Sequence, residues 1–220
     1  MKQTAIMDSH PTAGKTAPSR DFCLQLMARY GMLPNIRAHS LLVADIAELI
    51  TSRLIQTGFD LTPELVVAGA LLHDIGKTAC LHNGRDHARE GHDICLANDL
   101  PVALATIVAE HVVLRDHSPE GTFTEKEIVY YADKRVNHDQ VVDLGDRLAY
   151  ILGRYGRNNP QLLEAIDRNF QLCLALEKKI FSHLPFQPEE LAAQVTLFAA
   201  QKTTRTKPTN ISLAIDSTSC

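Results

Sequence analysis

Hydrophobic residues recur along most of this 220-residue chain at intervals of three and four, which is the spacing of an amphipathic helix. The pattern contains no internal repeat and no sustained alternation of the kind that marks β-strands. It therefore predicts an all-α protein. The expected helices cover about residues 21–30, 36–55, 63–75, 87–98, 101–112, 125–134, 139–155, 160–182 and 188–200.

Three of these helices carry recognisable start signals. Thr62-Pro63-Glu64 and Asn159-Pro160 each place a capping residue before a proline, and proline is favoured at the first position of a helix. Thr124-Glu125-Lys126-Glu127 has the pattern of a capping box, in which two side chains satisfy free backbone amides. Several expected loops contain a glycine, namely Gly31, Gly58, Gly84 and Gly121.

The composition is that of an ordinary globular protein, with 45% hydrophobic and 22% charged residues and a formal net charge of -4. Lys and Arg form no basic block, which argues against a nucleic-acid duplex as the main partner. The five cysteines are scattered without CxxC pairs, so we expect reduced thiols. With no secretory signal pattern and no apolar run of about 18 residues, we expect a cytoplasmic protein without a membrane partner.

The two ends differ from the rest of the chain. Residues 1–19 and 202–220 are rich in Ser, Thr, Pro and Lys and show little apolar periodicity, which is typical of flexible tails. The expected organisation is thus an N-terminal tail, one domain over residues 20–201 and a C-terminal tail. The sequence carries no signal for an oligomeric state.

Three polar residues lie on apolar faces of the expected helices: His39, His111 and Asp133. For a single histidine, a hydrogen-bonded core position is the commoner explanation. A buried imidazole or carboxylate is costly unless it is hydrogen-bonded, paired or bound to a metal. Three such residues on three helices favour one shared polar centre, which a buried metal would satisfy.

The strongest local pattern is Leu71–Lys77, where an apolar helix runs into His73-Asp74 and then Gly76, which can end or bend it. Adjacent side chains on a helix diverge by about 100°. His73 and Asp74 could therefore serve a dinuclear centre in which the carboxylate bridges two ions.

The motif His73-Asp74-Ile75-Gly76 spells HDIG, and over about residues 35–150 the chain resembles the HD superfamily of metal-dependent phosphohydrolases. The resemblance implies an HD-domain helical bundle with the metal site in its core. It also implies six histidine and aspartate ligands, which are enough for two divalent ions. These ions are expected to be Fe or Mn, while Co, Ni, Zn and Mg also suit the site. The ligand order implied by the resemblance is His39, His73, Asp74, His87, His111 and Asp133; four of these (His39, His73, Asp74 and Asp133) make the mononuclear site of many members.

His87 is chosen over two neighbouring histidines. The segment His87–Gly91 looks like the His-x-x-x-Gly helix start of the family, in which a small residue lets helices approach. His92 would point elsewhere on that helix, while His82 stays open as a loop alternative.

Lys77 follows the glycine and is either a solvated helix-end lysine or, as in HDIG-type phosphohydrolases, a residue that reaches the substrate phosphate. We expect the second role, so Asp74 and Lys77 are the candidate catalytic residues. Lys134 and Arg135, beside Asp133, are further candidates for substrate binding, and Arg147 is a weaker one of the same kind.

The resemblance implies hydrolysis of a phosphomonoester or phosphodiester by metal-activated water, with a nucleotide as the expected small substrate. The chain has no Ser-His-Asp, Cys-His, Walker or Rossmann pattern that would favour another chemistry. Tyr130–Asp133 echoes the hydrolases of symmetrical dinucleoside tetraphosphates only in part, and the Gly-Tyr-Pro motif of the cyclic-dinucleotide phosphodiesterases does not appear. Two alternatives stay open: a di-iron oxygenase with the same six ligands, and a non-catalytic nucleotide-binding regulatory module.

Overall fold

The structure is a computed structural model that describes residues 16–118, 120–155 and 159–205. Most of these residues are helical. The elements are α1 (Arg20–Arg29), α2 (Pro34–Gln56), α3 (Pro63–Leu72), α4 (Lys77–Cys80), α5 (His87–Ala97), α6 (Val102–Glu110), α7 (Glu125–Lys134), β1 (Val136–Asn137), β2 (Gln140–Val141), α8 (Leu144–Tyr155), α9 (Pro160–Phe181), the 3-10 helix η1 (Pro188–Glu190) and α10 (Leu191–Arg205).

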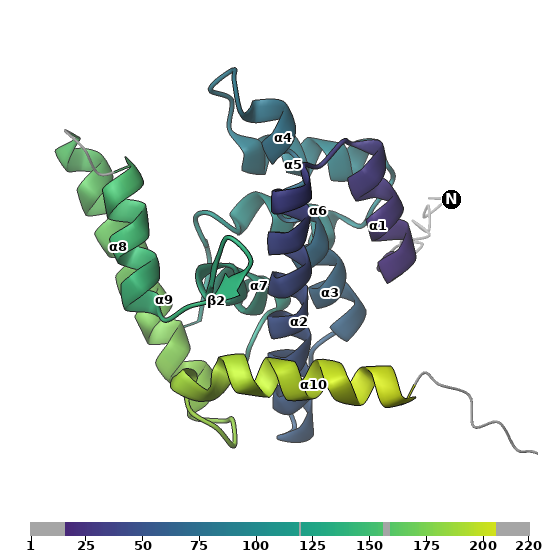
Figure 1. Ribbon diagram of the computed structural model, residues 1–220, viewed down its shortest axis with the longest axis vertical. Helices are drawn as coiled ribbons and strands as arrows, with labels where there is room; N and C mark the ends of the chain where they lie inside the picture. The colour runs from purple at the N-terminus through teal and green to yellow at the C-terminus, as the bar shows by residue number, and fades with distance from the viewer. Residues whose placement is uncertain (1–15, 119, 156–158, 206–220) are drawn as a thin grey trace, which may run out of the picture.

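Helix α2 runs through the middle of the bundle, where α3 and α7 pack against it (Figure 1). Its inner face is aliphatic, and Val43, Ile46, Leu49 and Ile50 are completely buried. Burying one such side chain stabilises the fold by about 1.5–3 kcal/mol. This apolar face fixes the position of α2 and therefore of His39, which lies one helical turn before Val43.

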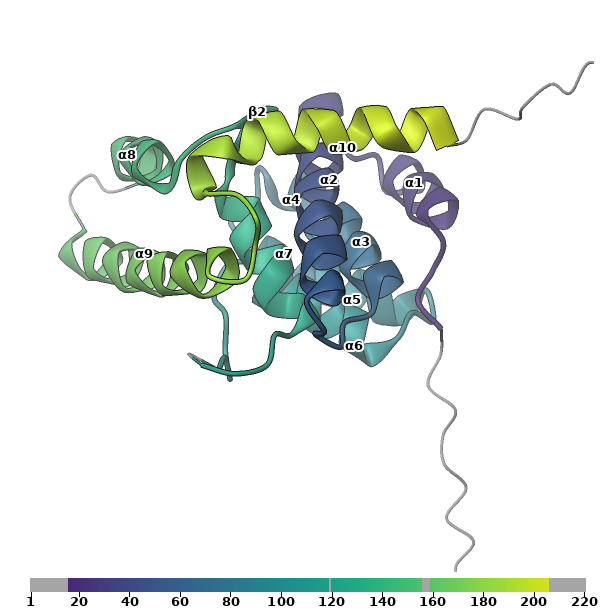
Figure 2. The ribbon, with the colours of Figure 1, turned by 90° about the horizontal axis from the view of Figure 1, so that it is seen from below.

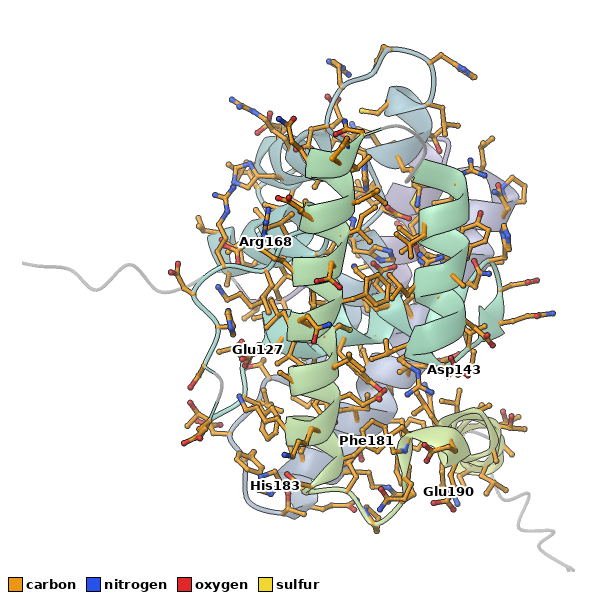
Figure 3. All side chains as sticks on the ribbon, turned by 90° about the vertical axis from the view of Figure 1, so that its left-hand side faces the viewer. Glu127, Asp143, Arg168, Phe181, His183 and Glu190 are labelled. Atoms are coloured by element: carbon orange, nitrogen blue, oxygen red, sulfur yellow. The ribbon has the colours of Figure 1, made fainter. Side chains whose placement is uncertain are left out.

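The C-terminal helices cover two sides of this central group. Helix α10 lies across α2, as two views show (Figures 1 and 2), and Lys202 Nζ lies 2.6 Å from Glu48 Oε2 at this crossing. Helices α8 and α9 lie side by side (Figure 3), and α9 also contacts α7. Helix α7 is thus held between α2 on one side and α9 on the other.

The prediction of an all-α bundle is confirmed, and the start signals act largely as expected. The capping box of Thr124 and Glu127 is formed, and the Asn159 side chain accepts a hydrogen bond from the Leu162 amide. Thr62 precedes α3 as predicted, although its side chain makes no capping bond.

Three predicted helices were wrong in their extent. The helix predicted over 63–75 ends at Leu72, because residues 73–76 form turns that lead into the short α4. The helix predicted from residue 139 begins at Leu144, because the chain first forms the antiparallel hairpin β1–β2 with His138 in the left-handed region (φ 56°). The last predicted helix is divided into η1 and α10.

The predicted tails can be compared with the structure only in part, because residues 1–15 and 206–220 lie outside the described residues. Helix α10 continues to Arg205, into the segment predicted as a C-terminal tail. At the other end, the Ser19 side chain caps α1 by accepting a hydrogen bond from the Phe22 amide. Among the described residues, no helix is both long and apolar enough to cross a membrane.

Candidate metal centre

The six predicted ligands come together in the interior of the bundle, from five helices and one turn. Asp74 lies in the turn after α3 and is 2% exposed. The other five occupy helices or helix ends: His39 in α2, His73 at the end of α3, His87 at the start of α5, His111 at the end of α6 and Asp133 in α7. His87 is half-buried and the other four are buried.

Three of the histidines are oriented by backbone carbonyl groups. Nδ1 of His73 lies 2.7 Å from the Ala70 carbonyl oxygen, and Nδ1 of His111 lies 2.7 Å from that of Val108. Nδ1 of His39 lies 3.0 Å from the carbonyl oxygen of His138, in the hairpin turn. Because a carbonyl oxygen only accepts, each Nδ1 carries the proton and each Nε2 faces the centre, as metal-binding histidines require.

Asp74 joins two groups of potential metal ligands. One group consists of His39, His73 and Asp74, and the other of Asp74, His87 and His111; within each group the ligand atoms lie within 4.8 Å of one another. Asp74 Oδ1 lies 3.4 Å from His87 Nε2 and 3.5 Å from His111 Nε2, whereas its Oδ2 lies 3.5 Å from His73 Nε2. One oxygen therefore faces each group, which is the arrangement of a carboxylate that bridges two ions.

Asp133 completes the first group. Its Oδ1 lies 3.0 Å from His39 Nε2 and 3.7 Å from His73 Nε2. Its Oδ2 accepts a hydrogen bond of 2.7 Å from Lys134 Nζ, which also donates to the His111 carbonyl oxygen at 2.9 Å. Lys134 thus links Asp133 in the first group to the backbone of His111 in the second.

Both carboxylates are negatively charged despite their burial. Burial disfavours the charged form of Asp74, but His73, His111 and Lys77 hold its pKa well below the usual range. Burial acts in the same direction on Asp133, where Lys134 and His39 hold the pKa well below the usual range. Two anionic groups in the core create a strong local attraction for cations.

The pKa values of His73, His87 and His111 are shifted in different directions. Burial and the neighbouring His111 lower the pKa of His87 to about 4, and burial also lowers the pKa of His111. Burial opposes the charged form of His73 as well, but the carboxylates of Asp74 and Asp133 outweigh it and raise its pKa. A histidine coordinates a metal as the neutral imidazole, which the lowered pKa values of His87 and His111 favour in the second group. At His73, a bound cation would replace the proton that Asp74 and Asp133 favour.

A nitrogen atom in the cluster, unpartnered within the described part of the chain, is a further sign that these six residues can hold a metal. The Nε2 atom of His73 is completely buried and finds no hydrogen-bond partner among the described residues. A buried polar atom without a partner costs about 1–3 kcal/mol, so it calls for a ligand. Nitrogen and oxygen donors in this number suit a divalent transition metal.

Two glycines allow the second group to form. A Cβ atom on Gly76 would lie 2.5 Å from the His87 carbonyl oxygen and 2.7 Å from the Gly91 amide nitrogen. A Cβ atom on Gly91 would lie 2.6 Å from Val108 Cγ1, in α6. Glycine is needed at both positions because α5 packs against the turn after Asp74 on one side and against α6 on the other.

The structure also distinguishes the three neighbouring histidines. His87 lies in the centre, where its Nε2 is 3.2 Å from His111 Nε2. His82 is exposed in the loop before α5, and His92 Nδ1 lies 2.9 Å from Asp93 Oδ1 outside the cluster. The cluster therefore contains the histidine that the helix-start pattern favoured.

The predicted substrate-binding residues lie in different environments. Lys77 Nζ is 2.6 Å from Asp74 Oδ2, and 40% of the Lys77 side chain is exposed. Lys134 is buried against Asp133, and Arg135 is buried against Tyr131 and Glu177. Lys77 is thus the one of these three with substantial exposure, whereas the contacts of Arg135 favour a structural role in place of the predicted phosphate contact.

No local pattern in the sequence indicated the three orienting carbonyl groups or the hairpin that supplies one of them. The carbonyl of His138 lies 99 residues from His39 in the chain. The other two carbonyl groups, of Ala70 and Val108, lie three residues before His73 and His111. A histidine at the end of an apolar helix is the only sequence signal that could have suggested these two contacts.

Comparison with known proteins agrees with this geometry. Residues 36–151 match the HD domain family. A tRNA (cytidine(56)-2'-O)-methyltransferase of Thermoplasma volcanium is 32% identical over 147 residues, which cover 59% of this chain and 41% of the relative. An uncharacterized protein of Methanocaldococcus jannaschii is 26% identical over 150 residues, which cover 63% of this chain and 88% of the relative.

The chain therefore spans less than half the length of the methyltransferase that it matches. No solved structure matches the chain with significance. The family match covers more than half of the chain and contains all six residues of the centre. On this evidence, together with the shared Asp74 of two metal-capable groups, the chain belongs to the HD domain family.

Proposed function

We propose that this protein is a metal-dependent phosphohydrolase that acts on a small phosphomonoester or phosphodiester, with a nucleotide as the expected substrate. The observation that carries the proposal is the position of Asp74 between two ligand groups, with the ammonium of the partly exposed Lys77 side chain at its Oδ2. Two adjacent cation sites with a lysine beside them suit a doubly or singly charged phosphate group. Iron or manganese is the expected metal on the basis of the family alone, because imidazole and carboxylate donors suit several divalent transition metals.

Each residue has a definite role in this proposal. His39, His73, Asp74 and Asp133 would hold one divalent ion, and Asp74, His87 and His111 would hold the other. Ions in these positions supply Lewis-acid chemistry, which activates water and neutralises charge on phosphate oxygens. Lys77 binds a phosphate oxygen through its ammonium and orients the phosphorus for attack, while the buried carboxylates keep the ligand set rigid.

The methyltransferase relative does not extend the proposal to methyl transfer. The match covers 41% of the Thermoplasma volcanium protein, and the chain has no glycine-rich Rossmann pattern for a nucleotide cofactor. This relative is named for a reaction on a cytidine of tRNA, which is consistent with a nucleotide as the expected substrate.

A phosphatase assay with two variants tests the proposal. The metal-free protein is reconstituted with Mn, Fe, Co, Ni or Mg and assayed on aryl phosphates, aryl phosphodiesters and a panel of nucleotides. We expect activity with at least one metal, and a loss of more than a hundredfold in His73→Ala and Asp74→Ala, which each lose a central ligand. The hydrolase proposal is wrong if the wild-type protein and both variants are equally inactive on every phosphate.

The same preparations separate the two alternatives. A di-iron oxygenase would consume dioxygen with a reduced organic substrate only in the iron form and only in air. A regulatory module would bind a nucleotide without turnover, and equilibrium dialysis of the nucleotides in the panel detects that binding.

A further inference from the structure

Arg135, at the end of α7, joins four separate segments of the chain through its guanidinium. Its Nε donates to the Val142 carbonyl oxygen at 2.7 Å, and its Nη2 donates to that of Pro188 at 2.9 Å. Its Nη1 donates to the Tyr131 hydroxyl at 2.6 Å and lies 3.0 Å from Glu177 Oε2, in α9. The residue is 3% exposed, so these bonds form away from solvent.

The network lies on the face of α7 opposite to the metal centre. Tyr131 and Arg135 are four residues apart and therefore share one face of the helix. Asp133 lies halfway between them, about 200° around the helix axis, and contacts His39 on the other side. A rotation of α7 that broke the network would therefore turn the Asp133 carboxylate away from its present partners.

Further polar contacts connect α7 to α9 along its length. The Tyr130 hydroxyl lies 2.9 Å from the backbone oxygen and 2.6 Å from Oδ1 of Asn169. Near the start of α7, Glu127 Oε1 lies 3.4 Å from Lys179 Nζ, and Figure 3 shows Glu127 beside α9. Hydrogen bonds are directional whereas apolar contacts are not, so these bonds fix the rotation of α7.

Helix α9 lies outside the residues that match the HD domain family, which end at 151. We propose that Arg135 and Glu177 are positioning residues, through which helix α9 sets the orientation of Asp133 and thereby the metal affinity of the first ligand group. The inference concerns cation binding, so it holds or fails independently of the hydrolase activity.

Cobalt titration of a matched pair of variants in α9 tests the inference. Glu177→Gln removes the negative charge that faces Arg135, and Glu164→Gln makes the same change at an exposed carboxylate, which pairs with Arg168 at 3.7 Å. Both full-length variants are titrated with Co²⁺, and the affinity and the visible absorption spectrum are recorded. Circular dichroism at the titration temperature verifies the fold.

We expect Glu177→Gln to bind Co²⁺ about tenfold more weakly and with an altered spectrum; this is the lower end of the roughly ten- to hundredfold cost of losing a direct partner of a ligand, because Glu177 acts on Asp133 through α7. Glu164→Gln should stay within twofold of the wild type. A Glu177→Gln protein that melts earlier but keeps the wild-type affinity and spectrum would show a purely structural role and overturn the inference.

A second variant keeps the test decisive if Glu177→Gln fails to fold. Tyr131→Phe removes the hydroxyl that accepts from Arg135 and donates to Glu177 at 2.7 Å, while the ion pair of these two residues remains. We expect a smaller loss of Co²⁺ affinity, about threefold, with a spectral change. Unchanged binding in this variant would also overturn the inference, whether or not the wild-type protein hydrolyses any phosphate.

Discussion

Lys77 and Asp74 form an ion pair whose two members differ greatly in burial. The Nζ and Oδ2 atoms are 2.6 Å apart, yet the lysine side chain is 40% exposed and the aspartate side chain is 2% exposed. The lysine thus connects a buried anionic ligand with the solvent. His87, whose side chain is 29% exposed, is the other partly accessible member of the centre. A substrate would therefore meet Lys77 and His87 first.

Replacement of Lys77 tests this geometry. We expect Lys77→Met to retain both metal ions but to lose phosphatase activity by about ten- to a hundredfold, because a hydrogen bond to a charged group contributes about 1.5–3 kcal/mol. The measurement is kcat and KM on the best phosphate of the panel, together with metal analysis. Lys178→Met, at an exposed position of α9, is the control and should be fully active. Equal activity in the two variants would exclude Lys77 from substrate binding.

Metal stoichiometry tests the division into two groups. His39 belongs to the first group and His111 to the second, and Asp74 belongs to both. We expect His39→Ala and His111→Ala each to retain about one ion per chain, and Asp74→Ala to retain less than either. Elemental analysis after reconstitution with Mn²⁺ and gel filtration gives these values. A wild-type protein that binds a single ion would reduce the centre to a mononuclear site.

Metal removal is expected to destabilise the fold. The Nε2 atom of His73 is buried without a partner among the described residues, and a cation held by the native state stabilises it by mass action. At a metal concentration of one hundred times Kd, the free energy of unfolding should rise by about 2.7 kcal/mol. Thermal unfolding with Mn²⁺ and with excess chelator measures this difference. His73→Ala should show a much smaller response to the metal, and an equal response would place the stabilising ion elsewhere.

The sequence indicated which polar residues lie together in the core better than it indicated the contacts that hold them in place. His39, His111 and Asp133 could be found because each interrupts an apolar face with helical spacing, which is a local signal. The partners of Arg135 could not be found, because Glu177 and Pro188 lie 42 and 53 residues away and no local pattern encodes such contacts. A charged residue beside a predicted ligand therefore suggested substrate binding, whereas its long-range contacts favour a structural role.

The hairpin β1–β2 also lacks a local pattern that could have predicted it. Strands β1 and β2 have two residues each, which is too short for an alternating pattern to appear. The turn between them nevertheless supplies the His138 carbonyl that orients His39. The apolar periodicity of the sequence thus predicted the helices and the core, but it did not predict the short connections between them.

Replacement of Gly76 tests the close packing of α5 against the turn after Asp74, which positions the second ligand group. A Cβ atom at this position would meet backbone atoms of His87 and Gly91 at 2.5 and 2.7 Å, so Gly76→Ala can be accommodated only if α5 moves. We expect a loss of about 1–3 kcal/mol in the free energy of unfolding, as for other overpacked sites, and the loss of the ion held by Asp74, His87 and His111.

Gly153→Ala is the matched control for this change. Gly153 lies inside α8, and a Cβ atom there would meet no heavy atom within 4 Å among the described residues. Alanine is favoured over glycine in a helix by up to about 1 kcal/mol, so this variant should be as stable as the wild type or more so, with both ions retained. Urea unfolding and metal analysis of the two variants provide the comparison. If Gly76→Ala matched Gly153→Ala in both measurements, the approach of α5 to the turn after Asp74 would not determine the second ligand group.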